Sequence, residues 1–166
     1  MTARTLLLPL AVVALAACRI EDRTPTGSRR DEEAVRAAVA TFYRTASAQQ
    51  WDSTRALLWD SAAVEVRPRA DSGWLAFRSA ADYVGYLAER DRGMQPGELG
   101  PRMVRTEFRQ EGGIAAMWVA TRLNERGLDG AVHEVSRTEH FVLRRVGPRW
   151  EIVNLVSAPE PVARER

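Results

Sequence analysis

The sequence predicts an α+β domain in which helices come first and a long antiparallel sheet follows. Two patterns in the chain of 166 residues support this prediction. Apolar residues recur every three to four positions in the first part, as in amphipathic helices, whereas the second half consists of strand-like segments between glycine-containing turns. A third observation, an apolar segment at 6–17 that ends at a cysteine, predicts a processing signal ahead of the domain.

The N-terminal segment has the features of a bacterial lipoprotein signal. Arg4 supplies a positive charge, and the apolar stretch 6–17 is too short to cross a bilayer as a helix. The letters "LAAC", which end at Cys18, resemble the lipobox of bacterial lipoproteins. This resemblance implies a signal peptide at 1–17 and a lipid on Cys18, and the alternative is an ordinary secretory signal. Arg19 favours the periplasmic face of the outer membrane over the inner membrane in a cell that has both.

The composition limits the chemistry of the mature domain. Cys18 is the only cysteine, so no disulfide can form within the domain and its core alone must hold it. A net charge of +2, with acids and arginines interspersed, argues against a nucleic-acid partner. All 24 basic residues are arginine, which excludes a Schiff-base lysine and a phosphate-loop lysine.

Polar segments mark the limits of the folded domain. Residues 18–30 contain a proline and a glycine and no hydrophobic period, so we expect a flexible tether that begins at the lipidated Cys18. Residues 158–166 are polar and contain prolines, and we expect a frayed tail there. The folded domain is therefore expected at 31–157.

Three helices are expected before the sheet. The first covers 31–50, where apolar residues keep the helical period and acidic residues occupy the first turn. Asp52 can cap a short second helix that contains Leu58. Ser79 and Asp82 form a capping box at the start of the third.

Short strands at 62–66 and 74–77 separate the helices, and an antiparallel meander follows. Its turns contain the glycine pair 112–113, the glycines at 127 and 130, and the Gly-Pro pair 147–148. The four long strands are expected at 102–111, 114–125, 131–146 and 149–157.

This order of elements resembles the nuclear transport factor 2-like superfamily, and in particular its SnoaL-like group. The resemblance rests on the opening helix ending in "FYRTASAQQWD", on the segment "LLWDSAAVEV" and on the closing "GPRWEIVNLVS". It implies a cone in which a curved antiparallel sheet wraps the N-terminal helices and leaves a pocket at its open end. The scaffold hosts isomerases, dehydratases, hydrolases and binding modules, so it does not by itself select a function.

The register of the last hairpin predicts which residues face that pocket. A two-residue turn at 147–148 pairs Leu143 with Ile152 and Phe141 with Asn154, provided that no bulge intervenes. The concave face then carries three polar side chains among apolar ones: Arg137, Glu139 and Asn154. The opposite face carries three apolar residues that would suit a homodimer contact: Val142, Val153 and Leu155.

The candidate pocket residues are Tyr43, Trp59, Arg137, Glu139 and Asn154. The two aromatic residues would line the cavity from the helical side, or else belong to the core. The three polar residues are either a ligand-facing cluster or an Arg–Glu pair at the rim of the sheet with an asparagine bonded to the backbone.

Positions where the resemblance places catalytic groups hold other residues. The ketosteroid-isomerase branch has its general base, an aspartate, on the early strand, where this chain has Val66. Relatives with a closing pair of histidines have them where this chain has Asn154 and Val156. His133 and His140 lie seven positions apart and would face opposite sides of a regular strand. We therefore expect no catalytic residue, no metal site and no cofactor.

The hypothesis that follows is a lipid-anchored, non-catalytic domain of the bacterial envelope that binds a small apolar ligand or a protein partner. One alternative is a SnoaL-like isomerase, hydrolase or dehydratase with Glu139 as general base and Arg137 as its electrostatic partner. Another is a structural envelope subunit whose cone is filled by its own side chains. A cavity of about 300 Å³ or more would favour binding over a filled cone.

Overall fold

The computed structural model describes residues 28–98, 100–126 and 130–160. Its helices are α1 (Arg29–Ser47), α2 (Trp51–Arg55) and α3 (Ala80–Arg90). Its strands are β1 (Leu58–Val66), β2 (Leu75–Phe77), β3 (Arg102–Glu111), β4 (Ile114–Arg126), β5 (Val132–Val146) and β6 (Arg149–Pro159). Cys18 and the signal peptide expected at 1–17 lie outside the described residues, as do the tether up to residue 27 and the tail from residue 161.

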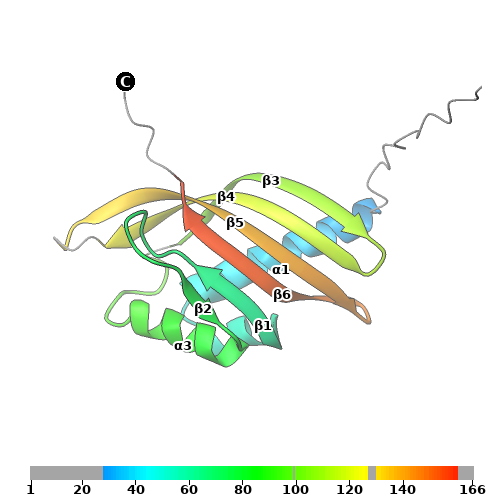
Figure 1. Cartoon of the computed structure of the whole chain (residues 1–166), viewed down its shortest axis with the longest axis horizontal. Helices are drawn as coiled ribbons and strands as arrows, with labels where there is room; N and C mark the ends of the chain where they lie inside the picture. Colours follow the sequence, from blue (N-terminus) through cyan, green and yellow to red (C-terminus); the bar gives the residue numbers. More distant parts are fainter. Residues whose placement is uncertain (1–27, 99, 127–129, 161–166) are drawn as a thin grey trace, which may run out of the picture.

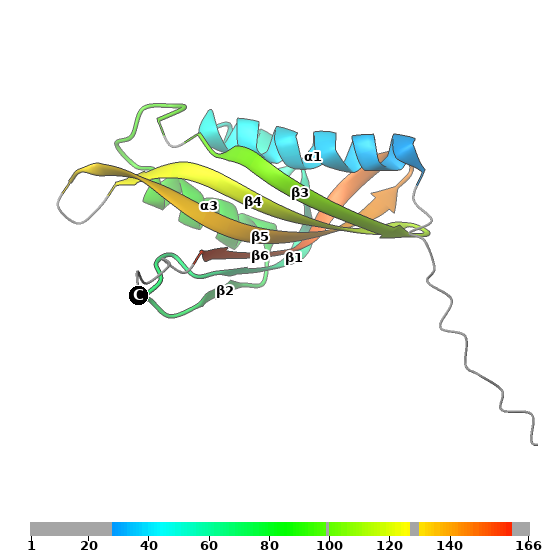
Figure 2. The same ribbon diagram turned by 90° about the horizontal axis from the view of Figure 1, so that it is seen from above.

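The six strands form one curved, unclosed sheet in the order β2-β1-β6-β5-β4-β3 (Figure 1). Neighbouring strands are antiparallel except β1 and β6, which run parallel. The long helix α1 lies along one face of the sheet, as Figure 2 shows from above, and α3 packs against β1. The predicted α+β architecture, with helices first and an antiparallel meander after them, is confirmed.

Local sequence explains where the two long helices begin. The hydroxyl of Ser28 accepts a hydrogen bond from the backbone N–H of Asp31 (3.1 Å), so α1 starts two residues earlier than expected. The hydroxyl of Ser79 accepts one from the N–H of Asp82 (3.1 Å), which confirms the predicted cap of α3. Both caps satisfy backbone donors that a helix start otherwise leaves without a partner.

The second helix is shorter than predicted, because Leu58 belongs to β1. Leu58 pairs with Ile152 of β6, and its side chain is buried in the core. The backbone N–H of Ile152 also donates to the carbonyl of Leu57 (2.9 Å). Pairing with a distant strand therefore overrides the local helical pattern at this position.

The hairpin of β5 and β6 keeps the predicted register only near its turn. Leu143 pairs with Ile152 as expected, but an irregularity between Val142 and Leu143 pairs Phe141 with Leu155 rather than with Asn154. The expected pairing of Phe141 with Asn154 is wrong because of this bulge, which moves one residue out of the alternation.

The bulge exchanges the faces of the residues beyond it. Leu155, expected on the outer face, is fully buried in the core. Val142 and Val153 are half-buried, and their role in a homodimer stays a prediction. Beyond the bulge β6 continues to Pro159, past the expected domain end at 157.

A single hydrophobic core lies between the helices and the concave face of the sheet. At its centre the ring of Phe141 meets the rings of Phe42 and Tyr43 edge-on, with centroid distances of 5.8 and 5.7 Å. Such edge-to-face pairs fix the position of α1 over β5. None of the described helices is both long and apolar enough to cross a membrane.

Candidate functional site

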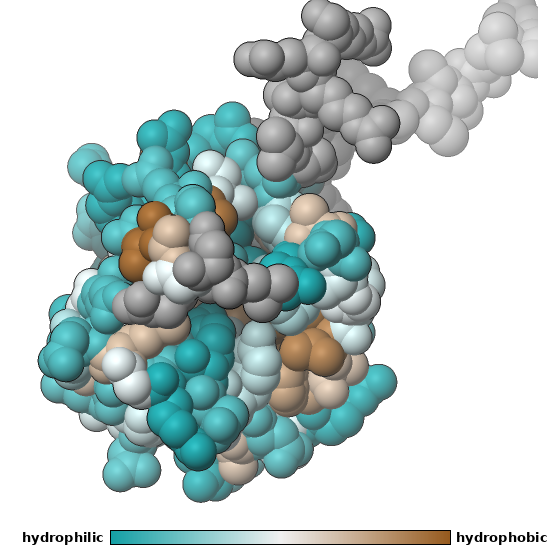
Figure 3. Space-filling view, turned by 90° about the vertical axis from the view of Figure 1, so that its left-hand side faces the viewer, coloured by the Kyte–Doolittle hydropathy of each residue, from teal (hydrophilic) through white to brown (hydrophobic). Residues whose placement is uncertain are grey.

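A cavity of about 340 Å³ lies at one end of the core, where α1 and α3 diverge from the curved sheet. Much of its wall is aromatic or aliphatic: Phe42, Tyr83, Tyr86, Leu87, Met94 and Leu123. The surface at the corresponding end of the molecule is largely hydrophilic, with small apolar patches (Figure 3).

Glu139 of β5 lines this cavity and is 8% exposed. Its carboxylate accepts hydrogen bonds from the hydroxyl groups of Tyr43 and Ser157 (2.8 Å), and Thr121 Oγ1 lies 3.5 Å from both this carboxylate and the carbonyl of Arg137. Its carboxylate forms no ion pair in the described part of the chain. Neutral donors therefore hold this buried carboxylate in place.

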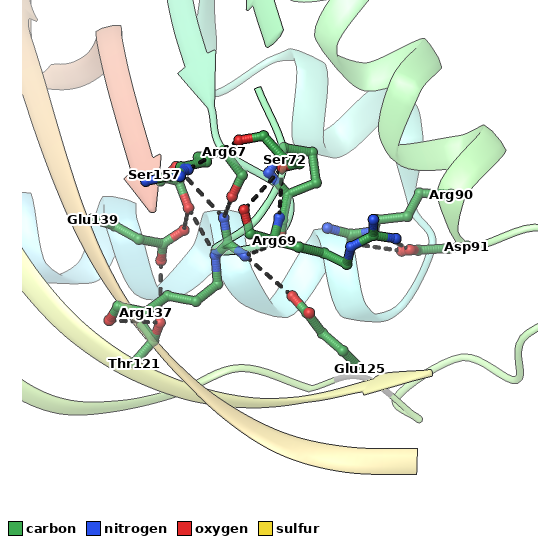
Figure 4. A network of polar contacts seen from close by, with 11 residues as sticks. Arg67, Arg69, Ser72, Arg90, Asp91, Thr121, Glu125, Arg137, Glu139 and Ser157 are labelled. Carbon is green, nitrogen blue, oxygen red and sulfur yellow. Dashed lines mark hydrogen bonds and ion pairs between the residues drawn. The ribbon is translucent and has the colours of Figure 1, made fainter. Parts of the chain in front are cut away.

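Arg137 lies two residues earlier on the same face of β5. All five N–H groups of its guanidinium donate hydrogen bonds to other residues of the protein (Figure 4). Its Nε donates to Ser157 Oγ (3.1 Å), and its Nη1 donates to the carbonyl of Pro68 (2.9 Å) and to Glu125 (3.2 Å). Its Nη2 donates to the carbonyls of Arg67 (2.6 Å) and Ser157 (3.5 Å). The guanidinium thus ties β5 to β6 and to the segment after β1.

Arg137 and Glu139 are connected through Ser157 and not directly. The hydroxyl of Ser157 accepts from Arg137 Nε and donates to Glu139 Oε1. Glu139 pairs with Ser157 across the β5–β6 ladder, and this pairing exists because of the bulge. In the regular register Val156 would have occupied the concave face instead.

Two tyrosine hydroxyls of the cavity stay protonated near neutral pH. Burial raises the pKa of Tyr43 well above its usual value of 10, and the charge of Glu139 raises it further. Burial also raises the pKa of Tyr83, and again the next cause is the charge of Glu139. The hydroxyl of Tyr43 donates to Glu139, and that of Tyr83 also keeps its proton.

The other charges around the cavity are paired within the protein. Arg90 at the end of α3 contacts the buried carboxylate of Asp91 through Nε (2.6 Å) and Nη2 (3.1 Å). Arg69 contacts Asp71 (3.0 Å) through its Nε. Each arginine that lines the cavity therefore has a carboxylate of its own.

Three of the five candidate residues meet at the cavity: Tyr43, Arg137 and Glu139. Asn154 does not, because the bulge turns it away and its amide donates to the carbonyl of Ala63 (3.0 Å). Trp59 does not line the cavity either. It follows Leu58 on β1, whose side chain faces the core, so the side chain of Trp59 points to the opposite face of the sheet. It is 40% exposed, with the guanidinium of Arg144 4.4 Å from its ring centre.

The sequence reasoning missed Ser157 and Tyr83. Ser157 could have been found only by placing the bulge, whereas Tyr83 was visible as an apolar-face residue of α3. Val66, at the position where the resemblance places a general base, does line the cavity, and it presents only hydrocarbon there.

The histidines contribute no metal site. The ring of His140 packs against that of Trp118 with a centroid distance of 4.4 Å and a tilt of 31°, away from the cavity, and burial lowers the pKa of His140. Within residues 28–98, 100–126 and 130–160, no three His, Cys, Asp or Glu side chains are close enough together to hold a metal ion.

Comparison with solved structures identifies the fold. An NTF2-like protein with a cystatin-like fold from Novosphingobium aromaticivorans superposes with a TM-score of 0.64 at 14% identity, covering 81% of this chain and 85% of that one. An NTF2-like protein of unknown function from Pseudomonas putida gives 0.65 at 14% identity, covering 82% and 92%. A ketosteroid isomerase-like protein from Erwinia carotovora atroseptica gives 0.62 at 14% identity, covering 81% and 100%.

No protein-family profile matches the chain, and no curated protein does. At such low identities the structural likeness establishes the fold alone. The described domain has the nuclear transport factor 2-like cone fold, in agreement with the fold expected from the sequence.

Proposed function

We propose that this chain is a lipid-anchored envelope domain that binds a small apolar ligand without chemical turnover. The observation that carries the proposal is the cavity of about 340 Å³, which has a largely aromatic and aliphatic wall and a single buried polar cluster. Ligand sites in proteins combine these features, with a few polar groups that orient a mostly apolar ligand. A cone filled by its own side chains would not leave this volume.

The bonding of Arg137 argues against the enzyme alternative. That alternative needs a guanidinium free to stabilise charge on a substrate, yet the five hydrogen bonds of Arg137 all go to the protein. Val66 supplies no proton acceptor either. Of the three carboxylates that line the cavity, those of Asp91 and Glu125 pair with arginines, so Glu139 has no second free group placed to work with it as an acid–base pair among the described residues.

A neutral fluorescent ligand tests for binding in the cavity. N-phenyl-1-naphthylamine is expected to bind saturably at one site per chain. Ala46→Phe places a ring in the cavity and should weaken binding by more than about tenfold, or about 1.4 kcal/mol. Ala37→Phe, on the exposed side of the same helix, is the control and should leave the affinity unchanged.

The measurement is a fluorescence titration of the full chain and both variants. Non-saturable binding, or equal affinity in the two variants, would show that the probe does not occupy the cavity and would contradict the proposal.

We also propose that a lipid on Cys18 holds the domain at the periplasmic face of the outer membrane. Cells grown with a labelled fatty acid should label the wild-type protein, and Cys18→Ala should abolish the label and release the protein from the membrane fraction. Thr24→Ala, in the expected tether, is the control. Labelling that persists in Cys18→Ala would rule out this attachment site.

A further inference from the structure

The strand β3 forms one edge of the sheet. It is the last strand in the order, and in the described part of the chain it pairs with β4 alone. In Figure 1 it runs along the upper margin of the sheet. An edge strand presents N–H and C=O groups on its outer side that can add a further strand to the sheet.

Three charged side chains of β3 have no counter-charge in the described part of the chain. Arg105, Glu107 and Arg109 are exposed and line one shallow hollow on the face of the sheet opposite the core. Their neighbours on β4 are all uncharged: Ala116, Trp118 and Ala120. Within the described ranges none of the three side chains forms a hydrogen bond or an ion pair, although the guanidinium of Arg109 lies 6.0 Å from the ring centre of Trp118. Opposite charges can therefore reach them only from beyond the edge.

The charges of β3 are complementary to those of a second copy of the same strand. The regular ladder with β4 runs from Arg105, just after a bulge, to Glu111, and Phe108 is its middle residue. If two copies pair antiparallel about Phe108, Glu107 of each lies opposite Arg109 of the other. Arg105 of each likewise lies opposite Glu111 of the other. Opposite charges then face each other at every charged position of the segment, which stabilises a pair of strands.

This charge pattern selects one register. A slip by one residue would place the charged face of one strand beside the core-facing side chains of the other. A slip by two residues in one direction places Glu107 opposite Glu107 of the second copy. A slip by two in the other direction places Arg109 opposite Arg109. Both of these slips bring like charges together, which is unfavourable.

Phe108 lies on the two-fold axis of the arrangement. Its ring is half-buried at the margin of the core, on the concave face of the sheet. Across the axis it lies opposite Phe108 of the second copy, and aromatic pairs between neighbouring strands stabilise a sheet. Such a contact uses the same surface on both copies, so it closes as a dimer.

We infer that two copies of this chain pair edge to edge through residues 105–111 of β3, antiparallel about Phe108, and form one continuous sheet. This contact differs from the homodimer expected on the outer face of the sheet, which would use Val142 and Val153. None of the residues 105–111 lines the cavity, so the inference does not depend on the proposed function.

Analytical ultracentrifugation of the full chain carrying Cys18→Ala measures the equilibrium between monomer and dimer. Glu107→Arg and Arg109→Glu each turn both opposite-charge contacts of this pair into like-charge contacts, and each should raise the Kd of the dimer by about tenfold or more. An equal mixture of the two variants restores opposite charges across the axis and should form a heterodimer. Glu65→Arg, at an exposed glutamate of β1, is the control and should leave the Kd unchanged.

Disulfide cross-linking tests the register in the same Cys18→Ala chain, which has no other cysteine. Residues directly opposite in an antiparallel ladder have Cα atoms about 4.5–5.5 Å apart, within the range that a disulfide spans. Phe108→Cys should therefore form a disulfide between two copies under mild oxidation. Arg105→Cys is the control and should not, because residue 105 lies opposite residue 111.

Three results would overturn the inference. The first is a chain that stays monomeric at about 100 µM, and this result needs no substitution in β3. The second is a dimer whose Kd neither charge variant changes, since its contact would lie on another surface. The third is cross-linking at residue 105 and not at residue 108, which would exclude pairing about Phe108.

Discussion

Replacing Arg137 with methionine is expected to lower the free energy of unfolding by about 3–5 kcal/mol, the usual cost of removing one partner from a buried ionic contact. The methionine keeps similar bulk but donates no hydrogen bond. The carbonyls of Arg67 and Pro68 then lose their donors, and Glu125 loses its counter-charge. Because these contacts join three separate segments, the loss should affect the whole domain.

Urea denaturation followed by circular dichroism measures this change. Arg92→Met is the control, since the side chain of Arg92 is 76% exposed and pairs with Glu89 on the surface. Exposed pairs contribute about 0–1 kcal/mol, so the control should be nearly neutral. Equal losses in the two variants would mean that the buried contacts of Arg137 do not stabilise the fold.

Phe141→Ala is expected to cost about 3–5 kcal/mol, the range found when a buried phenylalanine is truncated. Phe141 is 0% exposed, and its ring joins α1 to the sheet through Phe42 and Tyr43. Its removal leaves a void that the strands on either side cannot close without shifting.

The same denaturation experiment compares Phe141→Ala with Phe108→Ala. Phe108 of β3 is half-buried at the margin of the core, so its truncation exposes less new surface and should cost clearly less. A similar loss of unfolding free energy in both variants would show that Phe141 is not more important to core packing than Phe108.

The predictable parts of this fold are those that neighbouring residues determine. The cap at Ser79 depends on a side chain and an N–H three residues apart. The tight turn after Val146 connects β5 to β6. The two strands pair in the predicted register from Val146 to Leu143. Each of these features depends on chemistry within a few residues, which the sequence displays directly.

The errors arose where distant segments decide the outcome. The bulge beside Val142 has no local marker, and it places Leu155 in the core while the amide of Asn154 reaches Ala63 on β1. The same bulge puts Ser157 beside Glu139. Arg137 and Glu139 of β5 therefore lie at the cavity, whereas on β6 the register is shifted by one position, which turns Asn154 away and brings Ser157 to the cavity.

The parallel pairing of β1 with β6 has a consequence for the order in which the chain folds. Leu58 and Ile152 are neighbours in the sheet although nearly the whole domain separates them in sequence. The hairpins of β3, β4, β5 and β6 join segments close in sequence, whereas β1 must wait for a long loop to close. Ser157 lies on β6, the last strand to be synthesised, so a chain still emerging from the ribosome lacks the residue that connects Arg137 with Glu139. The proposed ligand site therefore cannot be complete before β6 has been made and has paired with β5.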